Sequence, residues 1–246
     1  MGFPSRIPGT VGRMTERAND HTRPIRIELG YTDATPGSVL ISMGETRVLC
    51  TASVENEVPR WMRDSGKGWV TAEYGMLPGS SPQRVHRDHI TGGRAKEISR
   101  LIGRSLRAAV SPAAMGELMV RVDCDVIQAD GGTRTAAITG GWIALHQALS
   151  QAVELGWVSD VPIVDEIAAI SVGIVDGELW LDLDYELDVR AEVDMNVVMS
   201  GRGLLVEVQG TAERAPFSRE ELDLMLDLAT KGITELHSLQ REAVTT

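Results

Sequence analysis

Apolar and polar positions alternate over much of the first half of the chain, and this pattern predicts β-strands. Period-two alternation with β-branched residues is typical of a strand that has one buried face. The strands predicted in this way cover residues 38–43, 47–54, 69–73 and 119–127. Residues 44–46, Gly-Glu-Thr, form a connection short enough to predict a hairpin between the first two strands.

Three other stretches repeat their apolar residues every three or four positions, which is the period of an α-helix. The first two are residues 95–110 and 135–155. The third helix begins at a capping box, in which Ser218 and Glu221 stand three residues apart and precede an apolar run. Each predicted helix therefore has an apolar face that can pack against a sheet.

The second half of the chain returns to strands. Residues 167–175 and 178–183 predict a hairpin, because the Asp176-Gly177 pair between them is a preferred two-residue turn. Residues 193–199 and 204–209 predict another hairpin. Strands in groups, followed by helices, indicate an α+β fold with mixed sheets packed against helices, rather than the regular strand–helix alternation of a Rossmann fold.

Organised sequence extends from residue 17 to residue 246, and we interpret it as a single domain with two sub-layers that divide near residues 155–165. Residues 1–16 are rich in Gly, Pro and Arg and predict a flexible N-terminal tail. Hydrophobic residues make up 43% of the chain and charged residues 24%, which is typical of a globular protein. No apolar run approaches the roughly 18 residues of a membrane helix, so no membrane partner is expected.

The net charge of −11 argues at first against a nucleic-acid ligand, because binding of a polyanion depends on neutralising its phosphates. The charge is unevenly distributed, however: residues 1–107 carry +5 and residues 108–246 carry −16. Residues 60–107 alone hold ten basic and four acidic side chains. A charge run is more often a solvated surface than a site, but this one is also consistent with local anion binding.

The two cysteines bear on the compartment of the protein. Cys50 and Cys124 lie in apolar, strand-like runs, where a small buried side chain is the usual role of a cysteine. They form no disulfide framework, and the chain has no Cys/His spacing of a zinc site. Unpaired thiols favour a reducing compartment, and we expect a cytoplasmic protein.

A turn at residues 130–135, Asp-Gly-Gly-Thr-Arg-Thr, connects a predicted strand to a predicted helix and has the chemistry of a phosphate site. Gly131 and Gly132 let the backbone approach a ligand closely, and the N–H groups at a helix start favour an anion. Thr133 adds a hydroxyl donor, and Arg134 adds a guanidinium that fits two phosphate oxygens. From the pattern alone, a tight turn without a ligand is equally consistent.

Arg94 is the second candidate for anion binding. It follows Gly92-Gly93 and stands just before another predicted helix. One glycine–arginine turn before a helix is weak evidence, and two in one chain are stronger. If the two helix starts converge, Arg94 and Arg134 would hold one phosphate from both sides.

Acidic residues gather in residues 181–194, and two of them, Asp188 and Asp194, are candidate ligands of Mg²⁺. They are six positions apart, so on one extended strand they would share a face. Mg²⁺ is usually held by one or two carboxylates together with substrate phosphates. The pattern alone favours a simpler interpretation, in which these acids form the polar side of a half-buried hairpin, and Asp182 and Asp184 are assigned to that polar side.

From about residue 17 to its C-terminus, the chain resembles the ribonuclease PH family. The resemblance consists of long, ordered blocks rather than single motifs, and one of them includes the turn at residues 130–135. The matching blocks are residues 37–54, 66–78, 97–108, 123–140, 193–198 and 206–213.

The resemblance implies the fold that ribonuclease PH shares with ribosomal protein S5 domain 2, and an enzyme that trims the 3′ ends of tRNA precursors and other RNAs. It implies that inorganic phosphate attacks the terminal phosphodiester, that nucleoside diphosphates are released, and that the reaction is reversible. It also implies Mg²⁺ as the cofactor and a homohexamer built as a trimer of dimers.

The functional residues of the family can be carried over to matching positions of this chain. Phosphate binding falls on Arg94, Gly132, Thr133 and Arg134, catalysis and metal binding on Asp188 and Asp194, and RNA binding on Arg84 and Arg87.

Two other functions remain consistent with the sequence. One is a catalytically silent subunit of an exosome-like ring that only binds RNA or acts as a scaffold, although such subunits tend to lose the arginines or aspartates that this chain retains. The other is an unrelated phosphate-binding metabolic enzyme, which the length of the matching blocks argues against.

Overall fold

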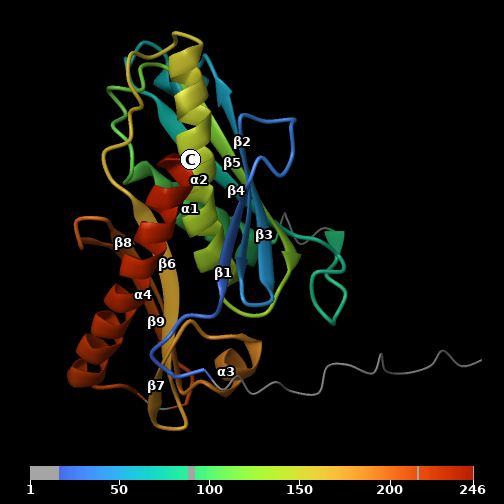
Figure 1. Cartoon of the computed structure of the whole chain (residues 1–246), viewed down its shortest axis with the longest axis vertical. Helices are drawn as coiled ribbons and strands as arrows, with labels where there is room; N and C mark the ends of the chain where they lie inside the picture. Colours follow the sequence, from blue (N-terminus) through green and yellow to red (C-terminus); the bar gives the residue numbers. More distant parts are fainter. Residues whose placement is uncertain (1–16, 88–91, 215, 246) are drawn as a thin grey trace, which may run out of the picture.

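The structure, a computed structural model, describes residues 17–87, 92–214 and 216–245. The flexible tail predicted for residues 1–16 lies outside the described residues. The chain forms two β-sheets with helices packed between and beside them (Figure 1). The α+β fold predicted from the sequence is confirmed, and none of the helices described is long and apolar enough to cross a bilayer.

The first sheet has five strands in the order β1-β2-β3-β5-β4. Its strands are β1 (Ile25–Leu29), β2 (Gly37–Met43), β3 (Thr46–Glu55), β4 (Trp69–Met76) and β5 (Met119–Gln128). All neighbouring strands are antiparallel except β4 and β5, which run parallel, and a short 3₁₀ helix, η1 (Arg60–Met62), precedes β4. The sequence prediction omitted β1, an edge strand too short to show more than three alternating apolar residues.

Helix α2 (Thr133–Glu154) packs on the first sheet and also contacts the second (Figure 1). Two glycines make the close packing possible. A Cβ on Gly140 would lie 2.7 Å from Cγ2 of Ile41, and one on Gly37 would lie 2.1 Å from the carbonyl oxygen of Ala144. Helix α1 (Gly93–Arg107) packs beside α2 and against β4. Because β4 and β5 are parallel and are followed in the chain by α1 and α2, both helices begin at the same end of the sheet.

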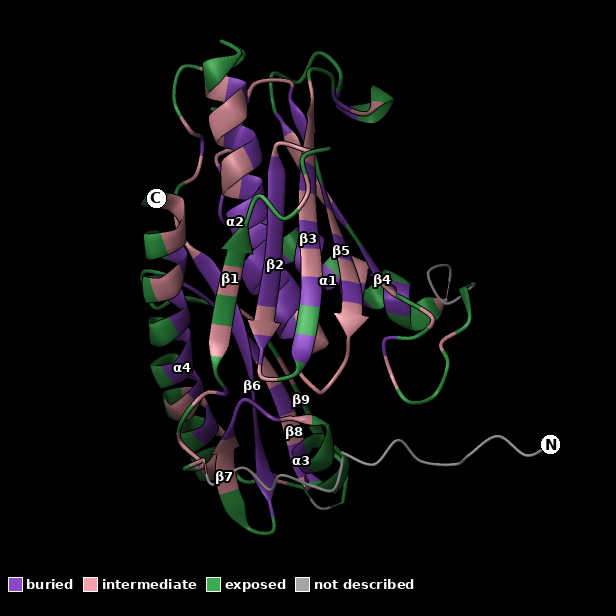
Figure 2. Cartoon of the chain, turned by 45° about the vertical axis from the view of Figure 1, so that its right-hand side comes forward, coloured by how far each residue is buried: buried purple, intermediate pink, exposed green. Residues whose placement is uncertain are grey.

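The second sheet has four antiparallel strands in the order β7-β6-β8-β9. Its strands are β6 (Ile167–Val175), β7 (Glu178–Leu181), β8 (Val193–Ser200) and β9 (Leu205–Ala212). Every residue of β6 is buried (Figure 2), because α2 covers one side of this sheet and α4 (Arg219–Thr245) also packs on β6. The capping box predicted for α4 is confirmed by hydrogen bonds from Ser218 N to Glu221 Oε2 and from Glu221 N to Ser218 Oγ.

Between β7 and β8 the chain forms a short helix, α3 (Tyr185–Arg190), that the sequence analysis did not predict. The expectation that Asp188 and Asp194 share the face of one strand is therefore wrong, because Asp188 lies on α3 and Asp194 on β8. Six residues make less than two helical turns, which is too few for an apolar period to stand out.

The buried role predicted for the two cysteines is confirmed. Cys50 and Cys124 face each other across β3 and β5, are both unpaired, and lie beneath α2. The Sγ atoms of both residues lie within reach of the carbonyl oxygen of Ala137.

Candidate active site

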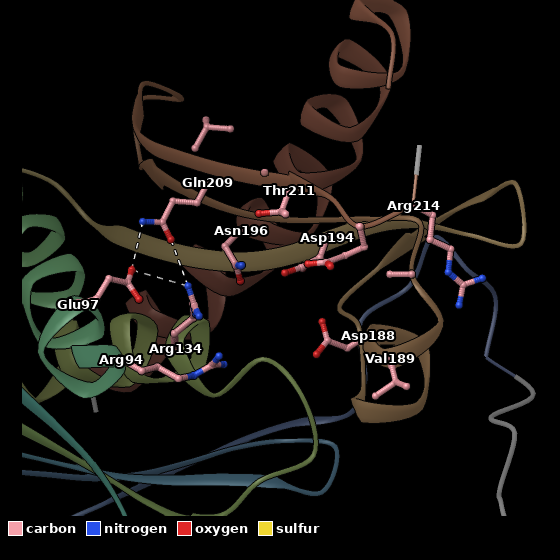
Figure 3. A pocket seen from close by; sticks show the side chains of 14 residues that line it. Arg94, Glu97, Arg134, Asp188, Val189, Asp194, Asn196, Gln209, Thr211 and Arg214 are labelled. Atoms are coloured by element: carbon pink, nitrogen blue, oxygen red, sulfur yellow. Dashed lines mark hydrogen bonds and ion pairs between the residues drawn. The ribbon is translucent and has the colours of Figure 1, made fainter. Parts of the chain in front are cut away.

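Two cavities of about 880 and 690 Å³ meet beside the starts of α1 and α2. Five side chains line both of them: Arg94, Arg134, Asp188, Asp194 and Asn196. In Figure 3 the two arginines lie on one side of the larger cavity and the two aspartates on the other. The structure thus brings together the basic and acidic candidates, which lie at least 54 residues apart in the sequence.

The turn between β5 and α2 has the backbone conformation that its glycines permit. Gly131 and Gly132 have φ values of +72° and +65°, which side chains with a Cβ rarely adopt. A Cβ on Gly131 would lie 2.5 Å from the carbonyl oxygen of Leu183, so the turn also packs directly against the segment before α3. A glycine is therefore required at position 131 for two reasons: the positive φ angle and the lack of space for a Cβ.

The helices whose starts face the cavities differ from the others in their N-caps. Gly92 caps α1 and Gly132 caps α2, and neither residue has a side chain that could bind the first free amides of the helix. By contrast, Asp184 caps α3 through a 2.9 Å hydrogen bond from Leu187 N, and Ser218 stands before α4. The first amides of α1 and α2 are therefore suited to binding an anion.

The buried pair Arg23 and Asp182 holds the turn between β5 and α2, which contains Gly131 and Gly132 and is called the glycine turn below. The guanidinium of Arg23 binds both carboxylate oxygens of Asp182, at 2.9 Å and 2.7 Å, and also donates to the carbonyl oxygen of Asp130. Burial alone would raise the pKa of Asp182, but the Arg23 charge and its hydrogen bonds hold that pKa below its ordinary value. Both Arg23 and Asp182 are therefore ionised in the folded protein.

Thr46, on the neighbouring strand β3, holds the same turn from another side. Its hydroxyl donates to the carbonyl oxygen of Gly131 at 2.6 Å and accepts from the backbone N–H of Asp130 at 2.9 Å. With the carbonyls engaged in this way, the position of the turn is set by the protein before any ligand binds.

Two assignments made from the sequence are wrong at this point. Asp182 was assigned to the polar side of a hairpin, but it is completely buried, because Arg23 supplies the partner that allows a charge inside the protein. Asp184 was assigned to the same face, but its carboxylate caps α3. Both residues support the site from outside the cavity surface formed by Asp188 and Asp194.

Thr133 has a partner that the sequence analysis missed. The hydroxyls of Tyr74 and Thr133 lie 2.8 Å apart, and Tyr74 is almost fully buried in the wall of the smaller cavity. Burial raises the pKa of the Tyr74 phenol, which therefore stays protonated and available as a donor. Its position as the sixth residue of β4 gave no signal of this contact, because the hydroxyl reaches a residue 59 positions away.

Asp188 and Asp194 lie close enough for their charges to interact. Burial, followed by repulsion from Asp188, raises the pKa of Asp194 to about 6. Burial also raises the pKa of Asp188, while Arg94 and Arg134 oppose the shift at both residues. A pair of partly desolvated carboxylates is a suitable site for a divalent cation, which would relieve their repulsion.

The donor set limits the kind of metal site that these residues can form. Within the part of the chain that the structure describes, no group of three or more His, Cys, Asp or Glu side chains could enclose a metal ion. Two carboxylates without further protein ligands fit Mg²⁺, which commonly completes its shell with water and substrate phosphates. They do not fit a zinc site, which needs three or four protein ligands.

The two predicted RNA-binding residues lie on the loop that borders the smaller cavity. Arg84 lines this cavity, and Arg87 is exposed at the end of the same loop. Residues 88–91 lie outside the described residues.

A basic, glycine-capped turn that faces two carboxylates is the arrangement expected of an enzyme that brings phosphate to a phosphodiester. The chain belongs to the 3′ exoribonuclease family, whose domain 1 matches residues 21–150 and whose domain 2 matches residues 165–232. Residues 151–164 lie between the two matches.

Curated relatives are named Ribonuclease PH. The protein from Corynebacterium kroppenstedtii is 54% identical over 235 residues, covering 94% of this chain and 92% of the relative. The one from Brucella ovis is 55% identical over 237 residues, covering 94% of this chain and 99% of the relative. At this similarity the chain is a phosphorolytic 3′→5′ exoribonuclease that processes tRNA 3′ ends, so the predicted enzyme class is confirmed.

More distant solved structures share the fold. Rice Rrp46 superimposes with a TM-score of 0.77 at 18% identity, covering 94% of this chain and 99% of that protein. A chain of the Archaeoglobus fulgidus exosome, described with RNA bound to the active site, also gives 0.77 at 18% identity, covering 92% of this chain and 90% of that chain. These neighbours confirm the predicted ribonuclease PH fold.

Proposed function

We propose that Arg94, Gly132, Thr133 and Arg134 bind the attacking phosphate in this exoribonuclease, and that Asp188 and Asp194 face the scissile phosphodiester. The observation that carries the proposal is the convergence of the two arginines and the two aspartates on the same pair of cavities. No other pairing of basic and acidic residues lines both cavities among the residues described.

The reaction brings two anions together, and the site has the means to offset their repulsion. Arg94 and Arg134 supply positive charge, and the first amides of α2 supply fixed dipoles that need no rearrangement. Phosphate held by a guanidinium and a rigid turn is aligned for in-line attack, which lowers the entropic part of the barrier. Phosphate at neutral pH is already an anion, so this step requires no strong base.

We propose that Asp188 and Asp194 hold Mg²⁺ with the substrate phosphates. The metal would stabilise negative charge on the scissile group. One of the two carboxylates could instead donate a proton to the departing 3′ oxygen, and Asp194, with a pKa of about 6, is the better suited of the two to carry that proton.

We propose that Arg84 and Arg87 contact the RNA strand upstream of the reacting nucleotide. Arg84 lines the smaller cavity and Arg87 is exposed on the same loop, which supports a path for the strand along this loop. Natural substrates would be tRNA precursors and other RNAs with accessible 3′ ends. Free thiols at Cys50 and Cys124 support a cytoplasmic location.

A homohexamer, assembled as a trimer of dimers, is proposed as the active form. Strand β9 is the outer strand of its sheet. Its first residue, Leu205, and the preceding Leu204 are both more than half exposed, as expected of an edge that pairs with another copy. Light scattering should give a mass near six chains, and Leu205→Glu should lower that mass. A monomeric wild-type protein would contradict the proposal.

The decisive experiment uses a tRNA that carries extra 3′ nucleotides. Shortening should require both phosphate and Mg²⁺ and should release nucleoside diphosphates. Release of nucleoside monophosphates without phosphate would contradict phosphorolysis. In the same assay Arg94→Ala and Asp194→Asn should each lose activity, and full activity in either variant would remove that residue from the proposed site.

A further inference from the structure

Arg134 has a neutral partner on one side of its guanidinium. The Nη1 group of Arg134 donates to the side-chain oxygen of Gln209 at 3.2 Å, while its distance to the nearer carboxylate oxygen of Glu97 is 3.9 Å. Figure 3 shows the three side chains in one cluster at the edge of the larger cavity. Arg134 comes from the start of α2, Glu97 from α1 and Gln209 from β9.

The amide of Gln209 can take only one orientation in this cluster. Its oxygen must accept from Arg134, because a guanidinium has donors only. Its nitrogen then donates to Glu207 at 2.9 Å and to Glu97 at 3.4 Å, and these two carboxylates have acceptors only. All three neighbours therefore select the same amide orientation.

Glu207, the nearer of the two acids, is itself fixed. Arg104 on α1 binds both of its carboxylate oxygens at 2.6 Å, and these hydrogen bonds raise the pKa of Arg104. A bidentate pair of this kind has a defined geometry. The Gln209 amide is thus held by a chain of contacts that begins on α1 and ends at Arg134.

A carboxylate in the place of Gln209 would give Arg134 an equally good hydrogen bond, but it would also cancel much of the guanidinium charge. A neutral amide orients the guanidinium and leaves its charge for an anion. Glu97 is half exposed, and its ion pair with Arg134 is long, at 3.9 Å, which is beyond normal hydrogen-bond distance.

We propose that Gln209 is a positioning residue for phosphate binding: it orients the Arg134 guanidinium without neutralising it, while Glu97 and Glu207 fix the orientation of its amide. The inference rests on the proposed role of Arg134 in phosphate binding. It assigns a function to β9, the strand farthest in sequence from the glycine turn among those that reach the site.

Two substitutions separate the effect of Gln209 on the orientation of the Arg134 guanidinium from the effect of charge at position 209. Gln209→Leu removes the acceptor but leaves the charge of Arg134, and Gln209→Glu keeps an acceptor but adds a charge. Both should raise the KM for phosphate, by about five- to tenfold for Gln209→Leu and by more for Gln209→Glu. The KM for RNA and the melting temperature should change little, since the amide is at the cavity edge.

Gln147→Leu is the matched control. Gln147 lies near the far end of α2 and accepts a hydrogen bond from the backbone N–H of Ser38, so its loss tests for a general effect of removing a glutamine amide. This variant should keep the wild-type KM for phosphate. Gln209→Asn, with a shorter amide, should fall between Gln209→Leu and wild type, and it provides a second measurement if the leucine variant folds poorly.

An unchanged KM for phosphate in Gln209→Leu, whether or not its kcat or melting temperature falls, would overturn the inference. Arg134→Lys tests the underlying function separately. If Arg134→Lys raises the KM for phosphate and Gln209→Leu does not, only the role of Gln209 fails. If neither variant changes it, the proposed phosphate site fails as well.

Discussion

Arg23 and Asp182, 159 positions apart in sequence, form an ion pair next to the glycine turn, with side-chain exposures of 3% and 0%. The pair connects the segment before β1 to the end of β7, and Arg23 reaches from it to the carbonyl oxygens of the turn. The position of the glycine turn therefore depends on a contact between the segment before β1 and the segment after β7.

Removing one partner of this pair should be costly. Asp182→Ala leaves the Arg23 guanidinium buried without its counter-charge, and such losses typically cost about 3–5 kcal/mol. Urea unfolding of the two proteins should show the difference. Asp223→Ala, which breaks the exposed pair with Arg219, is the control and should cost less than about 1 kcal/mol. A similar small loss in both variants would contradict the structural role of Asp182.

Asp194→Asn should make the protein more stable at pH 8 while abolishing activity. Because the folded-state pKa of Asp194 is raised to about 6, the folded state binds its proton more tightly than the unfolded state does. That stabilisation is complete below about pH 4 and is lost as pH rises through about 6. The asparagine, which is never charged, should gain on the order of 1–3 kcal/mol at pH 8.

The pH dependence provides the check on this prediction. Unfolding by urea without metal at pH 8 and at pH 4.5 should show the gain of Asp194→Asn shrinking toward zero at the lower pH. A variant that is no more stable than wild type at pH 8 would contradict the raised pKa. The buried Asp182 should behave with the opposite sign, because its lowered pKa gives stability that is lost as pH falls.

The two turn glycines should respond differently to alanine. A Cβ on Gly131 would meet backbone at 2.5 Å, whereas one on Gly132 would meet the end of the Arg23 side chain at 3.0 Å. We expect Gly132→Ala to fold with a loss of about 1–2 kcal/mol and a raised KM for phosphate, and Gly131→Ala to lose clearly more stability.

Gly177→Ala is the control for the glycine variants. Gly177 has a φ of +77° in the β6–β7 turn, but nothing lies within 4 Å of its added Cβ. It should therefore lose about 1 kcal/mol, the conformational cost alone, with phosphate kinetics unchanged. Equal losses at Gly131 and Gly177 would show that the turn does not pack as closely as described.

Tyr74→Phe should raise the KM for phosphate about two- to fivefold, because Thr133 loses the partner of its hydroxyl. Combined with Thr133→Val, the change should be non-additive, since each substitution removes the same contact. Steady-state kinetics of the two single variants and the double variant measure this coupling. Tyr31→Phe, at a half-exposed position, should behave like wild type, and additive effects of the first pair would contradict the coupling.

Periodic elements were predictable from the sequence. The sheet strands have alternating or continuous apolar runs, and the helices α1, α2 and α4 have clear apolar faces, so their positions followed from burial of one face. Strand β1 and helix α3 were missed, because five or six residues contain too little periodicity. Because α3 was missed, Asp188 and Asp194 were expected on one face of a strand, whereas Asp188 lies on α3 and Asp194 on β8.

The site was predictable only in part, for a physical reason. Glycines, threonine and arginine at a helix start have a local chemical signature, so Gly132, Thr133 and Arg134 were found. Asp182, Tyr74 and Gln209 have no such signature, because each acts through a partner that is distant in sequence. Their roles arise from the packing of the two sheets around α2.

The two halves of the chain contribute different components of the active site, with the arginines before residue 150 and the aspartates after residue 165. During synthesis, the first half leaves the ribosome before the strands that carry Asp194 and Gln209 exist. An unfinished chain thus has the two arginines but lacks Asp188 and Asp194, and it also lacks Asp182, the buried partner of Arg23 beside the glycine turn. The full set of charged side chains that line both cavities is therefore complete only after both halves of the chain have been synthesised.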